Sequence, residues 1–167
     1  MPKRAQMKGD SASLSNATSA RAALAASPAG TRRYRDRWAA RFVADFFRTS
    51  RSELSVSSLA HGTYLGESDD ATDALYADAV RHSLTAGVNL IDTAINYRCQ
   101  RSERVIGRVL QELIGEGALR RDEVVLCTKA GYIPLDGAPP ASREEYADYV
   151  KREYLDAGVV GSQEIVG

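Results

Sequence analysis

The chain of 167 residues has few of the residues that build disulfide frameworks and metal sites, with two cysteines and two histidines. Cys99 and Cys127 lack the CxxC spacing of a redox or zinc motif, so no metal site is predicted and a cytoplasmic location is favoured. Cys127 stands in an apolar run, and we expect it to be a small buried side chain. We expect His61 to pack beside a turn and His82 to lie on an outer helix.

An excess of charge of either sign is also lacking. Lys and Arg total 22, as do Asp and Glu, which gives a formal net charge of zero. A balanced chain has no bulk attraction for nucleic acid or an anionic membrane. No apolar run approaches the ~20 residues of a membrane span. We therefore expect neither nucleic acid nor a membrane as a partner.

The first 33 residues contain no aromatic residue, one acidic residue, six basic residues, and many Ala and Ser. Such a composition cannot bury enough apolar surface to offset the entropy of the chain, so residues 1–33 are predicted to be a disordered tail. An Arg- and Ser-rich start with little acid is also typical of an organelle transit peptide. Both interpretations of this segment stay open.

Aromatic residues recur at a helical spacing after the tail. Trp38, Phe42, Phe46 and Phe47 stand at i, i+4, i+8 and i+9. This pattern predicts a helix over residues 34–48 that packs on the rest of the domain, with a docking helix for a partner as the alternative. Residues 34–53 would then form an N-terminal helix and linker, and residues 54–167 the main domain.

Strand and helix patterns alternate from residue 54 onward. Strands are predicted at 54–60, 88–92 and 123–128. A helix is predicted at 71–86, with Gly87 as its stop. A second helix is predicted to begin after Ser102 as its N-cap, and a third at 142–154, after a Pro-rich loop. Apolar strands between amphipathic helices indicate an α/β fold with a parallel sheet. A doubly wound sheet and a barrel both satisfy this pattern, although the lack of GxGxxG after a strand weakens the first.

Polar residues gather where the predicted strands end. Gly62, Thr63 and Tyr64 follow the first strand, Asp92 and Tyr97 lie at the end of the second, and Lys129 follows the third. Because parallel strands end on the same face of a sheet, these side chains are expected to converge. A tyrosine is a poor acid at neutral pH, but a nearby ammonium makes its hydroxyl a better proton donor. Asp92, Tyr97 and Lys129 therefore suggest a group that protonates a carbonyl oxygen while hydride reaches the carbon.

These motifs resemble the signature of the aldo-keto reductase family. The stretch GVNLIDTAINY, followed by SERVIGRVL, is similar to the family's Gly-to-Asp-Thr-Ala-x-x-Tyr block with its Ser-Glu and Gly continuation. Thr128-Lys129 is similar to the family's Thr-Lys strand end, and Gly62-Thr63-Tyr64 to its Gly-Thr-aromatic turn. The resemblance runs from about Leu59 to Tyr132.

The resemblance implies an incomplete (β/α)8 TIM barrel made of the first three or so βα units, since a complete barrel needs about 250 residues. It implies that Tyr97 is the general acid, that Lys129 tunes it, and that Asp92 orients Lys129 and touches the nicotinamide ribose. Gly62, Thr63 and Tyr64 would line the cofactor and substrate mouth. NADPH, or NADH, would be the cofactor, and an aldehyde or ketone the substrate.

The sequence departs from the family where Arg98 follows Tyr97, a position at which glycine is common. The family's catalytic histidine after the fourth strand, and its late segments that hold the adenosine phosphate, have no counterpart here. We therefore expect an N-terminal part of an oxidoreductase that is inactive on its own. The alternative is a truncated remnant or interaction module that self-associates through an open sheet edge.

Overall fold

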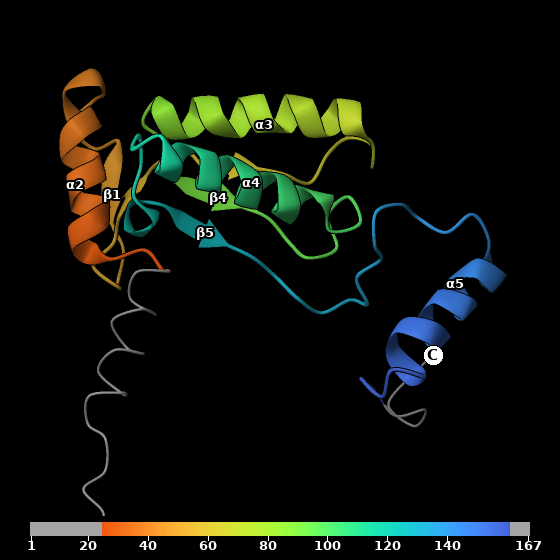
Figure 1. Cartoon of the computed structure of the whole chain (residues 1–167). Coiled ribbons are helices and arrows are strands. Elements are labelled where there is room, and N and C mark those ends of the chain that lie inside the picture. The colour runs from red at the N-terminus through yellow and green to blue at the C-terminus, as the bar shows by residue number, and fades with distance from the viewer. Residues whose placement is uncertain (1–24, 161–167) are drawn as a thin grey trace, which may run out of the picture.

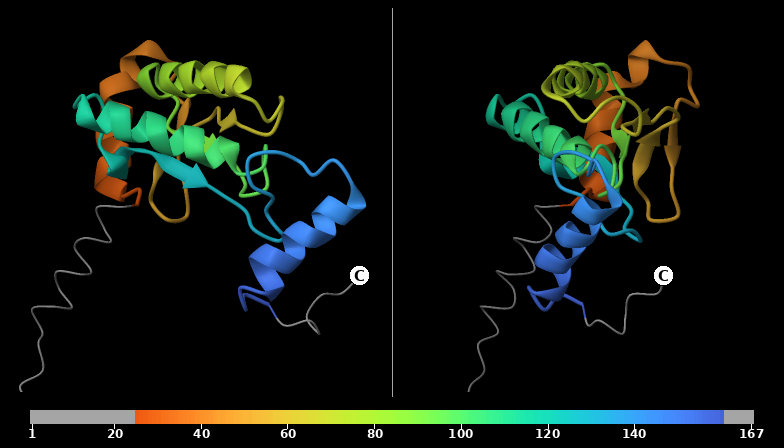
Figure 2. Two further views of the ribbon diagram at one scale, coloured as in Figure 1. Left: turned by 45° about the vertical axis from the view of Figure 1, so that its right-hand side comes forward. Right: turned by 90° about the vertical axis from the view of Figure 1, so that its right-hand side faces the viewer.

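A three-stranded parallel sheet forms the centre of the computed structural model, which describes residues 25–160. Its strands are β3 (His61–Gly62), β4 (Leu90–Asp92) and β5 (Val125–Cys127), in that spatial order. Helices α3 (Asp70–Thr85) and α4 (Arg101–Gly115) connect consecutive strands and cover the same face of the sheet (Figure 1, Figure 2). The predicted α/β fold with a parallel sheet is confirmed.

The hydrophobic core lies between the sheet and these two helices. The core-facing stripe of α4 follows the spacing of a helical face and consists of Val105, Ile106, Val109, Leu110 and Leu113. It packs against Val80 and Leu84 of α3 and against Ile91 of β4. Burying each of these side chains stabilises the fold by about 1.5–3 kcal/mol, which fixes both helices along the sheet.

The C-terminal end of α3 matches the prediction. Gly87 follows the last turn with a left-handed φ of 108°, a conformation that glycine adopts without steric cost. A Cβ atom at this position would lie 2.4 Å from the ring of Phe42. Gly87 therefore ends the helix and also lets the N-terminal aromatic residues approach it.

The start of α4 differs from the prediction, because Ser102 is not the N-cap. Gln100 holds that position with a φ of 69°, and its side chain makes no capping hydrogen bond. Ser102 lies inside the first turn, where its buried hydroxyl donates a hydrogen bond to the carbonyl of Thr63 at 2.7 Å. This serine fastens α4 to the loop after β3 instead of capping the helix.

The helix predicted over residues 34–48 is wrong at both ends. Helix α2 spans Pro28–Trp38, and the hydroxyl of its N-cap Ser27 accepts a hydrogen bond from the Gly30 amide at 2.9 Å. A serine cap followed by proline is a strong helix start. The predicted tail is therefore too long, since residues 28–33 are helical, and residues 1–24 lie outside the described range.

An antiparallel hairpin follows α2 and replaces the rest of the predicted helix. It consists of β1 (Phe47–Thr49) and β2 (Ser55–Ser57). The strand predicted at 54–60 therefore corresponds to β2, which belongs to the hairpin and not to the parallel sheet. The parallel sheet begins with β3, at the start of the predicted turn. The rings of Phe42 and Phe46 stack at 3.9 Å. Strand pairing and aromatic packing prevail over the helical spacing of these residues.

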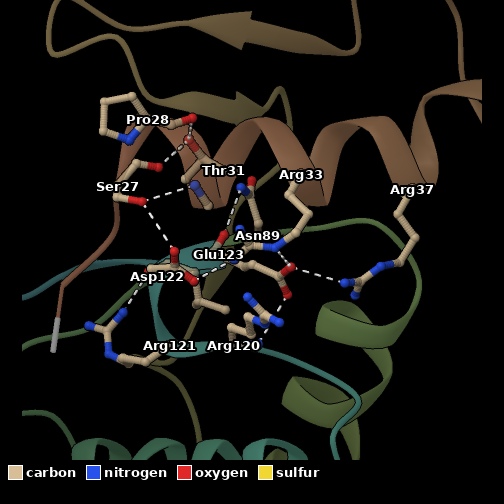
Figure 3. A network of polar contacts seen from close by, with 12 residues as sticks. Ser27, Pro28, Thr31, Arg33, Arg37, Asn89, Arg120, Arg121, Asp122 and Glu123 are labelled. Carbon is tan, nitrogen blue, oxygen red and sulfur yellow. Dashed lines mark hydrogen bonds and ion pairs between the residues drawn. The ribbon is translucent and has the colours of Figure 1, made fainter. Parts of the chain in front are cut away.

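Polar contacts fasten α2 and the hairpin to the end of the sheet where β4 and β5 begin (Figure 3). The fully buried carboxylate of Glu123 accepts hydrogen bonds from Arg33 and Arg37 of α2, each at 2.9 Å. Asn89, also fully buried, accepts a hydrogen bond from the Ser57 amide at 2.9 Å and donates one to the Glu123 carbonyl at 3.2 Å. This network closes the end of the sheet opposite the predicted site.

Tyr34 of α2 gives the fold a dependence on alkaline pH. Its fully buried hydroxyl donates a hydrogen bond to the Leu84 carbonyl at 2.7 Å, and burial raises its pKa above the ordinary value of about 10. A raised pKa means that this stabilisation is complete below pH ~10 and is lost as the pH rises further. We expect the free energy of unfolding, measured in urea, to fall above pH ~10 less steeply in Tyr34→Phe than in the wild type.

The matched control is Tyr132→Phe, since Tyr132 is 77% exposed. This variant should keep the wild-type alkaline slope. An equal slope in Tyr34→Phe and the wild type would show that the Tyr34 hydroxyl does not cause the alkaline loss of stability.

Helix α5 (Arg143–Val150) matches the charged helix predicted at 142–154 and continues in a wider π-helical turn, Lys151–Leu155. It lies away from the sheet, and most of its side chains are exposed (Figure 1). Among residues 25–160, no helix is long and apolar enough to span a membrane.

The predicted burial of Cys127 is wrong, because its side chain is exposed. Along β5 it follows Leu126, which packs against the core under the helices, so the Cys127 side chain lies on the opposite face of the sheet. Helices α3 and α4 cover the Leu126 face, so an apolar run in this strand is buried on that side alone.

Candidate active site

Asp92 and Lys129 meet at the carboxyl end of the parallel sheet. Asp92 is the last residue of β4, and Lys129 follows β5 by two positions. The lysine ammonium donates hydrogen bonds to both oxygens of the carboxylate, at 2.8 and 2.9 Å, and to the Thr93 carbonyl at 2.8 Å. The two side chains are about half exposed, so the ion pair remains open to solvent and to a ligand.

Tyr97 lies beside this ion pair. The nitrogen of Lys129 is 5.1 Å from the centre of the Tyr97 ring. A turn places the tyrosine, since its amide donates a hydrogen bond to the Ala94 carbonyl at 3.1 Å. The amide of Ile95 also donates to the carbonyl of Lys129 at 3.1 Å, so the two strand-end loops are joined directly.

A cavity of about 470 Å³ opens at these loops. Its volume is within the range of small-molecule sites, about 300–1,000 Å³. The lining residues come from all three strand ends: Tyr64, Ala94, Asn96, Tyr97, Lys129, Ala130 and Tyr132. Tyr64 contacts Tyr97 edge to face, with ring centres 5.0 Å apart. A further cavity of about 530 Å³ lies beside α5, away from these strand ends.

The structure brings together some of the predicted residues and not others. Tyr64, Tyr97 and Lys129 line the cavity, with Asp92 held by Lys129. Gly62 does not reach it and is instead paired with Asp92 in the sheet. Thr63 is buried, and its hydroxyl donates a hydrogen bond to the Asp92 carbonyl at 3.2 Å, which makes its observed contact a support for β4.

Sequence reasoning missed Ala94, Asn96, Ala130 and Tyr132 as lining residues. All of them are one to three positions from a predicted site residue on the same strand-end loop. That proximity is a usable signal, because loops at the carboxyl ends of parallel strands form the ligand sites of such sheets.

Neither histidine lines the cavity. His61 packs outward, with Nδ1 2.9 Å from the Ser83 hydroxyl and its ring edge to face with Tyr76. Burial lowers the pKa of His61, which favours the neutral ring. His82 is exposed on α3, so both predicted placements are confirmed. Glu103 lies in the first turn of α4 and accepts a hydrogen bond from the Thr128 hydroxyl.

The electrostatics of the site keep Lys129 charged. The hydrogen bonds to Asp92 raise the pKa of Lys129 above its ordinary value, and Tyr97 adds to this effect. We expect Asp92→Asn to lower the pKa of Lys129, measured by NMR titration of its ε-carbon in the labelled chain. Asp136→Asn, on the separate Arg104 ion pair, is the control and should change nothing. Equal values in Asp92→Asn and the wild type would show that the carboxylate does not hold the ammonium.

The loop after Tyr97 contains three consecutive residues with left-handed backbone. Arg98, Cys99 and Gln100 have φ values of 49°, 53° and 69°. This conformation costs an L-residue roughly 1–2 kcal/mol, so the surrounding contacts must hold it in place. Arg98 therefore occupies a backbone position that suits glycine.

Comparison with known families assigns the chain to a class. Residues 58–159 match the Aldo/keto reductase family, which covers more than half of the chain. The chain belongs to this family.

A curated relative is the 6-dehydroglucose reductase of Novosphingobium aromaticivorans. It is 31% identical over 118 residues, which are 67% of this chain and 36% of the relative. The chain thus spans about a third of the length of that relative.

Proposed function

We propose that this chain carries the proton-donating part of an NAD(P)H-dependent carbonyl reductase site. The observation that supports the proposal most is the Asp92–Lys129 ion pair at 2.8 Å, beside Tyr97 in a cavity at the strand ends. An acid, with a cation and a carboxylate beside it, can supply the proton that reduction of a carbonyl consumes.

In this proposal Tyr97 donates its hydroxyl proton to the carbonyl oxygen of the substrate. The Lys129 ammonium stabilises the negative charge left on the tyrosine oxygen, because an adjacent cation favours the phenolate. Asp92 holds the ammonium in place through two hydrogen bonds. Bound NADPH, or NADH, supplies the hydride. Tyr64 lines the mouth of the cavity, opposite the edge of the Tyr97 ring.

The cavity fits part of the cofactor. Its volume of about 470 Å³ can hold a nicotinamide beside a small carbonyl compound, and the Asn96 amide offers hydrogen bonds to the carboxamide of the cofactor. The Asp92 carboxylate, which is paired with the lining residue Lys129, is the group that would contact the ribose. Among the lining residues, all within the described range, Lys129 carries the positive charge and is already paired with Asp92. The diphosphate therefore needs other contacts, and turnover by this chain alone is expected to be slow or absent.

We further propose that the described chain from β3 onward is part of a (β/α)8 barrel domain. The strands follow one another in the order β3-β4-β5, and both connecting helices lie on one face of the sheet. One half of a doubly wound sheet has the same arrangement, so the match of residues 58–159 to the Aldo/keto reductase family is what favours the barrel. The polar side chains at the strand ends match the usual position of a barrel active site.

A second candidate function is an inactive module that self-associates. In the described range, β3 and β5 each leave one edge of the sheet unpaired. Leu65 and Leu75, 74% and 70% exposed, lie beside the β3 edge. Open edges and apolar surface favour association.

The cysteines in the described part, Cys99 and Cys127, form no disulfide, which supports the proposed cytoplasmic location.

The test is reduction of carbonyl compounds, followed as oxidation of NADPH with the chain in excess. Sugars that carry an aldehyde come first, since the relative is named for such a substrate. Reduction that depends on Tyr97 supports the enzyme. A folded chain that reduces none of the compounds, and that sediments as a dimer or larger species, supports the second candidate.

A further inference from the structure

We propose that Arg98 is a positioning residue that holds Tyr97 against Tyr64 and Lys129, in place of the glycine common in the family. The inference rests on the proposed function of Tyr97 and extends it to a residue outside the cavity. The observation behind it is a set of hydrogen bonds made by residues 98–100, whose backbone is left-handed. These bonds attach the loop of Tyr97 to the loop after β3 and to the loop after β5.

The Arg98 side chain is 1% exposed and lies against the loop between β3 and α3. Its guanidinium donates hydrogen bonds to the Glu67 carbonyl at 2.8 Å, the Asp69 carbonyl at 3.3 Å and the Asp73 carboxylate at 2.5 Å. It also lies 5.0 Å from the centre of the Tyr76 ring. The loop that it binds begins just after Tyr64, so Arg98 joins the loops of two cavity-lining tyrosines.

The rest of the segment binds the loop on the other side, between β5 and α5. The carbonyl of Cys99 accepts a hydrogen bond from the Gly137 amide at 3.0 Å, and the side-chain amide of Gln100 donates to the Leu135 carbonyl at 2.9 Å. That loop carries Tyr132 and Ala130 of the cavity wall. All three strand-end loops therefore meet at the segment that directly follows Tyr97.

The chemistry of Arg98 explains why a strained residue stands where glycine would be relaxed. A planar guanidinium has several donors in a fixed arrangement and can reach two backbone carbonyls and a carboxylate at once. Glycine would relieve the backbone but would remove the hydrogen bonds that join the loop of Tyr64 to the loop of Tyr97. Lysine would keep the charge but offers a compact ammonium that cannot reproduce this set of contacts.

The experiment measures the nuclear Overhauser effect between the ring protons of Tyr64 and Tyr97 in the full chain with labelled tyrosines. Spectra of Tyr64→Phe and Tyr97→Phe assign the signals. We expect the effect in the wild type, its loss in Arg98→Gly and a weaker effect in Arg98→Lys. Arg101→Ala is the matched control, because Arg101 also binds Asp73, at 2.7 Å, but from α4. It should keep the wild-type effect.

An unchanged effect in Arg98→Gly would overturn the proposal and leave Arg98 as a structural ion pair. Should Arg98→Gly not fold, Arg98→Lys decides: a weaker effect supports the proposal and an unchanged one overturns it. The measurement needs neither cofactor nor substrate, so it is separate from the test of the enzyme. In any preparation that reduces a carbonyl, Arg98→Gly should also lower kcat about 100-fold with little change in NADPH affinity, the loss expected for a displacement of about 1 Å.

Discussion

In any preparation that reduces a carbonyl, replacing Tyr97 by phenylalanine should lower the rate of reduction about 1,000-fold, within the range that a positioned proton donor contributes. The ring would keep its contact with Tyr64, because that contact is made between the two aromatic rings. NADPH affinity should therefore change little, and the loss should fall on the chemical step. The measurement is the rate of NADPH oxidation in a single turnover, with the cofactor affinity determined separately.

Two further variants sharpen this prediction. Tyr132→Phe removes a hydroxyl from another tyrosine that lines the same cavity, and it should retain the wild-type rate. Lys129→Met should lower the rate of reduction by a factor similar to that of Tyr97→Phe. The double variant should lower the rate little further, because the effects of residues that act as one unit are not additive. A Tyr97→Phe chain that reduces carbonyls at the wild-type rate would show that the proton comes from elsewhere.

Replacing Asn89 by alanine should destabilise the fold by about 3 kcal/mol. Asn89 is fully buried, accepts a hydrogen bond from the Ser57 amide, and donates to the carbonyls of Ser55 and Glu123. Alanine would leave these three backbone groups without their side-chain partner, and each buried unsatisfied group costs about 1 kcal/mol or more. The measurement is urea unfolding followed by circular dichroism.

Asn96→Ala is the control for this prediction, since Asn96 is an exposed asparagine on the same stretch of chain. It should change the free energy of unfolding by no more than about 0.5 kcal/mol. Equal midpoints for the two variants would mean that the hairpin and the sheet are not joined through Asn89.

The sequence patterns predicted the elements whose burial is regular. Helix α4 was predictable because its buried stripe follows the helical period, and β4 and β5 because they are short apolar runs. The β1–β2 hairpin was not, since Phe42, Phe46 and Phe47 have a helical spacing that tertiary pairing overrides. The start of α2 had a local signal at Ser27-Pro28 that the low-complexity composition before it obscured.

The site residues at the ends of strands were predictable, and those whose positions depend on contacts between loops were less so. Asp92 and Lys129 converge because they end adjacent parallel strands. The hydrogen bonds of Arg98 were not predictable, because two of its partners are backbone carbonyls of a loop distant in sequence. Backbone carbonyls leave no residue-specific pattern in a sequence. The buried position of Asn89 likewise depends on the hairpin, which the sequence did not predict.

The most direct test of the central claim, that the strand ends form a cofactor-dependent reductase site, is the binding of NADPH to the purified chain followed by nicotinamide fluorescence. We predict a saturable change that excess NADP⁺ reverses and that Tyr97→Phe retains, because the hydroxyl serves the proton transfer. No change at millimolar NADPH, in a chain shown to be folded, would contradict the claim that the described residues hold the cofactor at Tyr97 and Lys129.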